Sequence, residues 1–207
     1  MVSGARRVIV FLAATVVLVA CLATLETLVR RAGWRHETTR RIAHVLACLY
    51  AVVSHSVLPL WAFVLACSVF LVVLVVSRRL RVLTAVHVTR RDSLGEVYLP
   101  GGIIIAALAG ETAGSDDVFL ASILILAFAD VAAGVTGDIL RSPTKTWWGS
   151  LVFFLVAGVV AVACGFPPLT ALAVATVTAG VERVSSRGTD NLSVPLAAGM
   201  LLALLPR

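Results

Sequence analysis

Four polar clusters interrupt an otherwise apolar chain of 207 residues, and one of them holds its single lysine. Lys145 lies in the stretch RSPTKTWWGS, residues 141–150, whereas every other basic side chain among the 17 lysine and arginine residues is arginine. A lysine ammonium is a compact charge on a long stem and can reach a phosphate oxygen. Gly149 and Ser150 open the next predicted helix and would offer backbone N–H groups and a hydroxyl to the same anion.

A second cluster places Asp130 inside an apolar helix, in the stretch AFADVAAGVTGD, residues 127–138. A charged carboxylate in a membrane span costs about 2.5–3.5 kcal/mol on insertion scales and marks a functional site by default. Gly134 and Gly137 follow on the same helix and permit close backbone approach, either to a phosphate or to a packed helix. The alternative for Asp130 is a structural ion pair with an arginine.

A third cluster, VERVSSRGTDNLSVPL, residues 181–196, joins the end of one predicted helix to the start of the next. Glu182 ends the first helix, and Asp190 with Asn191 begins the second. Oxygen ligands of this kind, close to phosphate-binding cations, are what Mg²⁺ recruits. The alternative is that Asp190 and Asn191 only cap a helix.

The remaining cluster is TTRRIAHV, residues 38–45, with Arg40 and Arg41 at the expected start of a helix and His44 one turn further on. Cations at a helix N-terminus oppose the helix dipole, so their presence favours a bound anion such as polyphosphate. The alternative is that they anchor the chain at the cytosolic membrane surface.

Composition indicates what kind of protein carries these clusters. The chain is 60% hydrophobic and only 14% charged, whereas soluble domains are about 45–50% apolar. A chain of this length cannot bury so much apolar surface in its own core, so part of that surface must face lipid. We therefore predict an all-α integral membrane protein, with residues 1–207 forming a single transmembrane domain.

The apolar stretches predict a polytopic bundle of about eight transmembrane helices. They cover roughly residues 8–29, 42–57, 59–77, 95–110, 117–136, 148–165, 168–183 and 191–206. Several are shorter than the roughly 20 residues that cross a bilayer perpendicularly. If the helices alternate, the loops on one side hold most of the arginines, whereas the loop at 111–117 is acidic.

By the positive-inside rule the basic side is cytosolic, and all four clusters lie there. The net charge of +6 is thus a topology signal and does not indicate nucleic-acid binding. We expect a multi-pass protein in the plasma membrane of a prokaryote, in contact with membrane lipid, with its active site facing the cytosol. A homo-oligomer is compatible with the sequence.

In order and spacing, the clusters resemble the CTP-dependent lipid-alcohol kinases, a family that includes phytol kinase, dolichol kinase and fungal-type diacylglycerol kinase. This family shares a superfamily with phosphatidate cytidylyltransferase. The resemblance covers residues 38–200, leaving the N-terminal helix in 1–37 outside it, and SLGEVYLP, residues 93–100, resembles a further family stretch. The matching residues are Arg40, Arg41, His44, Asp130, Gly137, Lys145, Thr146, Gly149, Ser150, Asp190, Asn191, Val194, Pro195 and Leu196.

The resemblance implies transfer of the γ-phosphoryl group of CTP to a lipid alcohol such as a polyprenol, phytol or diacylglycerol, assisted by Mg²⁺. Asp130, Lys145 and Asp190 would be catalytic, with Asp130 or Asp190 as the base, and Asp130, Glu182 and Asp190 are the metal-ligand candidates. The expected nucleotide-binding residues are Arg40, Arg41, His44, Gly137, Lys145, Thr146, Gly149, Ser150 and Asn191.

Two other functions stay open at this point. A cytidylyltransferase would use the same CTP but react at its α-phosphate and release pyrophosphate. A small ion-coupled transporter would use Asp130 and Glu182 as ion or proton sites. The transporter is disfavoured because the sequence shows no inverted repeat.

Overall fold

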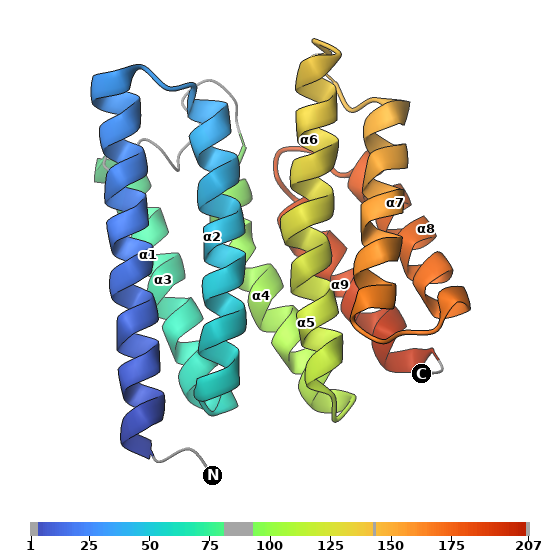
Figure 1. The fold of residues 1–207 in the computed structure, drawn as a ribbon, viewed down its shortest axis with the longest axis horizontal. Helices are drawn as coiled ribbons and strands as arrows, with labels where there is room; N and C mark the ends of the chain where they lie inside the picture. The colour runs from blue at the N-terminus through green and yellow to red at the C-terminus, as the bar shows by residue number, and fades with distance from the viewer. Residues whose placement is uncertain (1–3, 81–92, 143, 206–207) are drawn as a thin grey trace. The chain divides into compact units, whose positions relative to one another are not determined.

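The structure is a computed structural model that describes residues 4–80, 93–142 and 144–205, and the regular structure within these ranges is helical (Figure 1). The elements are α1 (Gly4–Ala32), α2 (His36–Val57), α3 (Leu60–Leu80), α4 (Gly95–Thr112), α5 (Asp116–Leu124), the π-helix η1 (Ile125–Ala129), α6 (Asp130–Ile139), α7 (Trp147–Ala163), α8 (Pro168–Val184) and α9 (Asp190–Leu204). Arg81, Arg90 and Arg91, which contributed to the predicted basic side, lie outside the described residues.

The all-α prediction is confirmed, and each of the eight predicted apolar segments is a helix. The described residues form eight separate helices, because α5, η1 and α6 follow one another without a break. Within the same ranges, three helices are long and apolar enough to cross a membrane: Gly4–Ala32, Leu60–Leu80 and Asp116–Ile139. This is fewer than the eight spans that the sequence predicts.

Short helices account for part of the difference between the eight predicted spans and the three long apolar helices. The helices α7, α8 and α9 have 17, 17 and 15 residues, which at about 1.5 Å per residue is less than the roughly 30 Å hydrocarbon core of a bilayer. Of these, α7 and α9 are apolar. The first turns of α2 contain His36, Glu37, Arg40 and Arg41, so this helix is polar at one end.

The chain forms two compact units, which divide between Gly101 and Gly102. In the N-terminal unit, α1 packs along α2, and Thr15 of α1 shares a 2.9 Å hydrogen bond with the Tyr50 hydroxyl of α2. The salt bridge between Arg78 and Glu96 joins the end of α3 to the start of α4 in the same unit. The prediction of one transmembrane domain stays a prediction.

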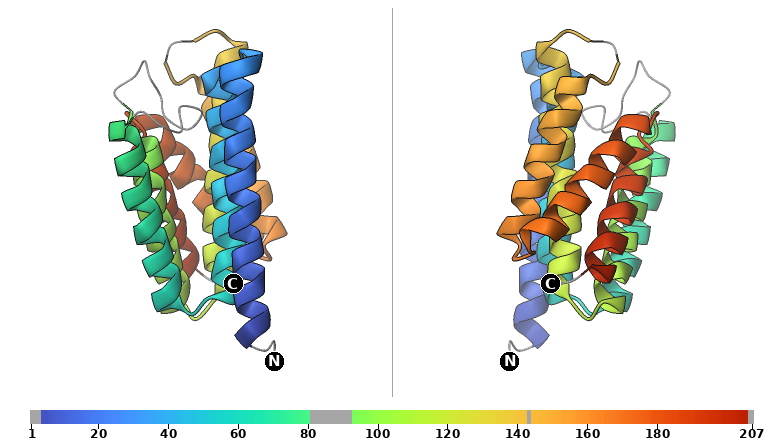
Figure 2. Two further views of the ribbon diagram at one scale, coloured as in Figure 1. Left: turned by 90° about the vertical axis from the view of Figure 1, so that its left-hand side faces the viewer. Right: turned by 90° about the vertical axis from the view of Figure 1, so that its right-hand side faces the viewer.

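In the C-terminal unit, α7 packs against α8, α6 and η1, while α9 packs against α8 and α5 (Figures 1 and 2). The fully buried side chains that fill the space between these helices include Phe119, Ile123, Ile125, Leu126, Phe153, Val174, Val194 and Leu202. The short connections make successive helices antiparallel. The start of α7, the end of α8 and the start of α9 therefore lie at one end of the unit.

A candidate cation and phosphate site

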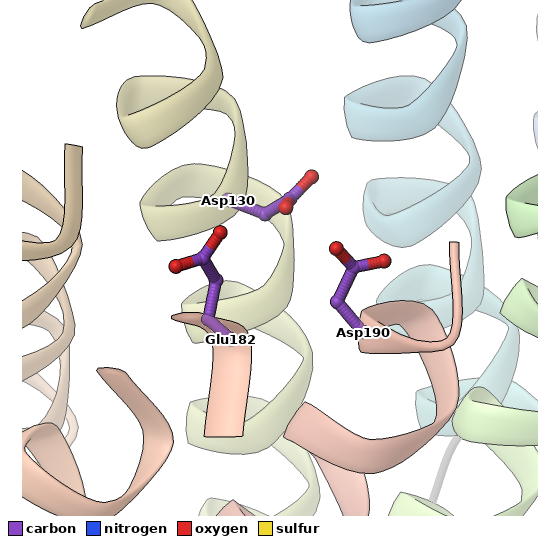
Figure 3. A group of neighbouring side chains, drawn as sticks. All are labelled: Asp130, Glu182 and Asp190. Atoms are coloured by element: carbon purple, nitrogen blue, oxygen red, sulfur yellow. The ribbon is translucent and has the colours of Figure 1, made fainter. Parts of the chain in front are cut away.

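Three carboxylates from different elements of the C-terminal unit converge: Asp130 of α6, Glu182 of α8 and Asp190 of α9 (Figure 3). One oxygen from each lies within 4.8 Å of the others. Glu182 is buried, and the other two are half-buried. We call this group the carboxylate triad.

A π-helix carries Asp130 to the triad. The five residues Ile125–Ala129 form η1, and Asp130 is the first residue after it. π-helical turns inside α-helices are rare and occur frequently at functional sites, because the extra residue changes the direction of the side chains around it. Four of the five η1 residues are buried against the core, so packing holds this irregular turn.

The turn between α8 and α9 carries the other two carboxylates. Glu182 lies in the last turn of α8, and Asp190 is the first residue of α9. Arg187 and Gly188 between them adopt left-handed backbone angles, with φ of 53° and 86°, which let the chain reverse within a few residues. The side chain of Asp190 accepts a 3.1 Å hydrogen bond from the backbone N–H of Asn191.

Thr189 occupies the N-cap position of α9 and makes no capping hydrogen bond with its side chain, so the bond from the Asn191 N–H to Asp190 is the side-chain contact to the first turn. Asn191 is buried where α4 crosses the start of α9. A Cβ atom on Gly102 of α4 would lie 2.0 Å from the Asn191 carbonyl oxygen, so glycine is required at this crossing. Pro195 has no N–H to donate to that carbonyl, which a helix would otherwise bond at this position.

Lys145 bonds to two members of the triad. Its Nζ lies 2.6 Å from Glu182 Oε1 and 2.8 Å from Asp190 Oδ2, and it also donates to the Glu182 backbone carbonyl. Burial lowers the pKa of the Lys145 ammonium, but the charges and hydrogen bonds of Asp190 and Glu182 more than offset this and raise the pKa above its ordinary value. Lys145 therefore places a positive charge at the edge of the triad.

The residues directly after Lys145 form the start of α7. Thr146 is the N-cap residue of α7, and its side chain accepts a 2.9 Å hydrogen bond from the Gly149 N–H. A Cβ atom on Gly149 would lie 3.2 Å from the Ala133 carbonyl oxygen of α6, so α6 and α7 approach closely here. Ser150, one turn into the helix, accepts a 3.3 Å hydrogen bond from Arg183.

Gly137 and Gly149 are both predicted site residues, but their surroundings differ. Among the described residues, a Cβ atom on Gly137 would meet nothing within 4 Å, so no close helix contact is seen at Gly137 there and its predicted phosphate role stays a prediction.

Arg40, Arg41 and His44 belong to the N-terminal unit, so their approach to the triad stays a prediction. The expectation that the two arginines start a helix is wrong, because α2 begins at His36 and they lie in its second turn. Glu37 explains this arrangement: its carboxylate lies 2.7 Å from Arg40 Nη2 and 3.3 Å from Arg41 Nη2. An acid in the first turn offsets the unfavourable dipole interaction of the cations.

Sequence reasoning missed two residues at these clusters. Glu37 could have been found, because an acid three and four residues before two arginines is a helical ion-pair pattern. Arg183 also carries a signal, since it follows Glu182 directly. Its guanidinium carbon lies 3.7 Å from the centroid of the Trp147 ring, a cation–π contact that joins the end of α8 to the start of α7.

Fold and site together define a helical protein with apolar membrane-type helices and a lysine–carboxylate cluster at one end of a helix bundle. A comparison with characterised proteins finds similarity to a protein named phytol kinase from Synechocystis sp. (strain ATCC 27184 / PCC 6803 / Kazusa). The two are 28% identical over 198 residues, which cover 88% of this chain and 85% of that protein. No protein-family profile and no solved structure matches the chain.

Proposed function

We propose that the protein is a membrane kinase that transfers the γ-phosphoryl group of CTP to the hydroxyl of a lipid alcohol. The observation that carries this proposal is the convergence of Asp130, Glu182 and Asp190 with the chain's single lysine. Phosphoryl transfer needs cations for the phosphates and carboxylates for a metal and a proton, and these residues supply both kinds of group. Similarity to a protein named phytol kinase over most of the chain supports the choice of a lipid alcohol as acceptor.

The donor set of the triad fits Mg²⁺. Magnesium prefers carboxylate oxygens and usually keeps several waters, so it needs only a few protein ligands. Asp130, Glu182 and Asp190 offer three oxygens within 4.8 Å of one another. Bound there, Mg²⁺ would neutralise negative charge on the nucleotide phosphates.

The remaining roles belong to side chains and backbone of this chain. Lys145 would bind a phosphate oxygen, with the Ser150 hydroxyl of α7 close by. The Gly149 and Ser150 N–H groups, which the sequence offers to the anion, already donate to Thr146. Arg40, Arg41 and His44 of the N-terminal unit would hold the rest of the triphosphate. Asn191 and Gly137 would complete the nucleotide site.

In the reaction, the lipid oxygen forms a bond to the γ-phosphorus while the bond from that phosphorus to the β–γ bridging oxygen breaks, leaving CDP. Asp130 or Asp190 accepts the proton of the lipid hydroxyl and later releases it to water. No electron transfer is involved. Positioning and charge neutralisation therefore account for most of the rate.

We further propose that all eight helices insert, with the shorter ones lying where the bilayer is thinned or where they end at a cavity in the protein. Many large apolar side chains are exposed on the helices, among them Val16, Trp61, Val72, Trp147 and Val159, which suits contact with lipid. The alcohol would then enter from the cytosolic leaflet with its tail still in lipid.

A panel of lipid alcohols tests the proposal. The purified protein in nanodiscs is incubated with Mg²⁺, γ-labelled CTP and one alcohol at a time: phytol, geranylgeraniol, a longer polyprenol or diacylglycerol. We expect label to appear in one class of lipid phosphate. Absence of labelled lipid with every alcohol, for protein that is folded, would reject the kinase assignment.

A further inference from the structure

Lys145 is the proposed phosphate ligand, yet in the structure it bonds to two of the proposed metal ligands. Its ammonium bonds to Glu182 Oε1 at 2.6 Å and to Asp190 Oδ2 at 2.8 Å, and both residues are proposed metal ligands. The second oxygen of Asp190 accepts a hydrogen bond from the Asn191 N–H. The carboxylate of Asp190 is therefore engaged on both of its oxygens.

A divalent ion and this ammonium compete for the same oxygens. Magnesium sits about 2.0–2.1 Å from its oxygen ligands, so an ion on Glu182 Oε1 and Asp190 Oδ2 would be separated from the ammonium by those two oxygens alone. Like charges repel strongly at such a separation, and more so in a partly buried site than in water. The Glu182 side chain is only 7% exposed and that of Asp190 14%, so little water is available to screen the repulsion.

We propose that Lys145 is an exchangeable internal cation of the triad: it neutralises Glu182 and Asp190 until a divalent ion replaces it there. The displaced ammonium then becomes available to a phosphate oxygen. This inference rests on the proposed function for the identity of the phosphate, because the nucleotide supplies it. The exchange itself concerns only Lys145, the triad and the ion.

The exchange makes metal and nucleotide binding cooperative. An ion that binds alone must displace the ammonium into solvent, whereas an ion that arrives with CTP gives the ammonium a phosphate partner. Coupling between two ligands is reciprocal, so CTP tightens metal binding as much as the metal tightens CTP binding. A lysine fits this role better than arginine would, because its single ammonium on a flexible stem can change partners without rebuilding a forked hydrogen-bond pair.

Metal binding to the full-length protein, without nucleotide, tests the exchange directly. Mn²⁺ is titrated and free ion is measured by electron paramagnetic resonance in wild type, in Lys145→Met and in Arg141→Met. Arg141 is an exposed cation in the same loop and serves as the matched control. We expect Lys145→Met to bind Mn²⁺ about tenfold more tightly or better, because the competing charge is gone, and Arg141→Met to bind like wild type. Equal Mn²⁺ affinity in wild type and Lys145→Met would overturn the exchange.

A measurement on the wild-type protein covers the case in which Lys145→Met does not fold. Because Lys145 is the only lysine, trace acylation of lysine, read by mass spectrometry of its peptide, reports on this one ammonium. We expect saturating Mn²⁺ to accelerate acylation and added CTP to slow it again. An acylation rate of Lys145 that is the same with and without Mn²⁺ would contradict the exchange.

The two proposals fail in different ways. If the exchange is wrong but the function is right, wild type still transfers label from CTP to lipid. In that case Mn²⁺ affinity is the same in wild type and Lys145→Met, and the acylation rate of Lys145 does not depend on Mn²⁺. If the function is wrong, no lipid is labelled, yet Mn²⁺ still competes with Lys145.

Discussion

Asp130 owes its position to an irregular turn, and this distinguishes it from the surface acids of the protein. It follows η1 directly and joins Glu182 of α8 and Asp190 of α9. A carboxylate placed in an apolar helix only for stability would need no such convergence. We therefore propose that Asp130 serves metal or proton chemistry.

Replacing Asp130 by Asn keeps its size and removes its charge. We expect turnover to fall by about 100-fold or more, as for loss of a general base or a metal ligand, while the melting temperature in detergent stays close to wild type. Asp138→Asn alters an exposed acid at the end of the same helix and should leave turnover within about twofold. Near-normal turnover of Asp130→Asn would remove Asp130 from the site.

Substitutions of Lys145 test its proposed contact with a phosphate oxygen. Lys145→Arg keeps the charge but introduces a bulkier, forked group, so we expect it to lower kcat more than it raises KM for CTP. Lys145→Met should be worse, by about 3–4 kcal/mol in the barrier, as for loss of an electrostatic contact to the transition state. Steady-state kinetics separate the two parameters. Wild-type kcat in Lys145→Arg would show that any positive charge at this position suffices and that the compact ammonium of lysine is not required.

At the scale of helices, the close approach of α6 and α7 sets the spacing between Asp130 and the Lys145 segment. Gly149 makes this approach possible, since a Cβ there would lie 3.1 Å from the Thr146 hydroxyl and 3.2 Å from the Ala133 carbonyl oxygen. The Ala133 carbonyl oxygen belongs to the backbone, so it cannot move away by a side-chain rotation. Any larger residue at position 149 must therefore move the helices apart.

We expect Gly149→Ala to cost about 1–3 kcal/mol of stability through overpacking and to lower turnover as well. Gly158→Ala is a matched control on the same helix, because its Cβ would meet Ala175 at an ordinary 3.7 Å. That change should be neutral or stabilising by about 0.5–1 kcal/mol, since alanine is the better helix former. Thermal unfolding and kcat of both variants provide the comparison, and equal behaviour of the two would contradict the proposed spacing.

The sequence predicts the helices well and the site only in part. Apolar runs identify the eight helices because hydrophobicity alone distinguishes them from the polar loops. The turn at η1 has no residue signature, since its five residues are all apolar, like those of the helix around it. The bonds from Lys145 to Glu182 and Asp190 are equally hidden, because they join residues 37 and 45 positions apart. Only tertiary structure reveals that the lysine faces acids.

For the whole molecule, the proposal requires the loops of the site to face the cytosol. In a background without the four native cysteines, a cysteine at Thr144 should react with an impermeant maleimide only from the cytosolic side. A cysteine at Thr112, an exposed position at the acidic end of α4, should react only from outside. The reverse labelling pattern would place the site away from CTP.

The fate of the phosphorus atoms of CTP distinguishes the three candidate functions. Purified protein in nanodiscs, supplied with Mg²⁺ and a lipid alcohol, is given CTP labelled either at the γ-position or at the α-position. We expect γ-label to move to the lipid, α-label to stay in CDP, and Asp130→Asn to abolish the transfer. Movement of α-label to the lipid with release of pyrophosphate would instead show a cytidylyltransferase, and movement of neither label would leave an ion-coupled transporter; either result would contradict the kinase assignment.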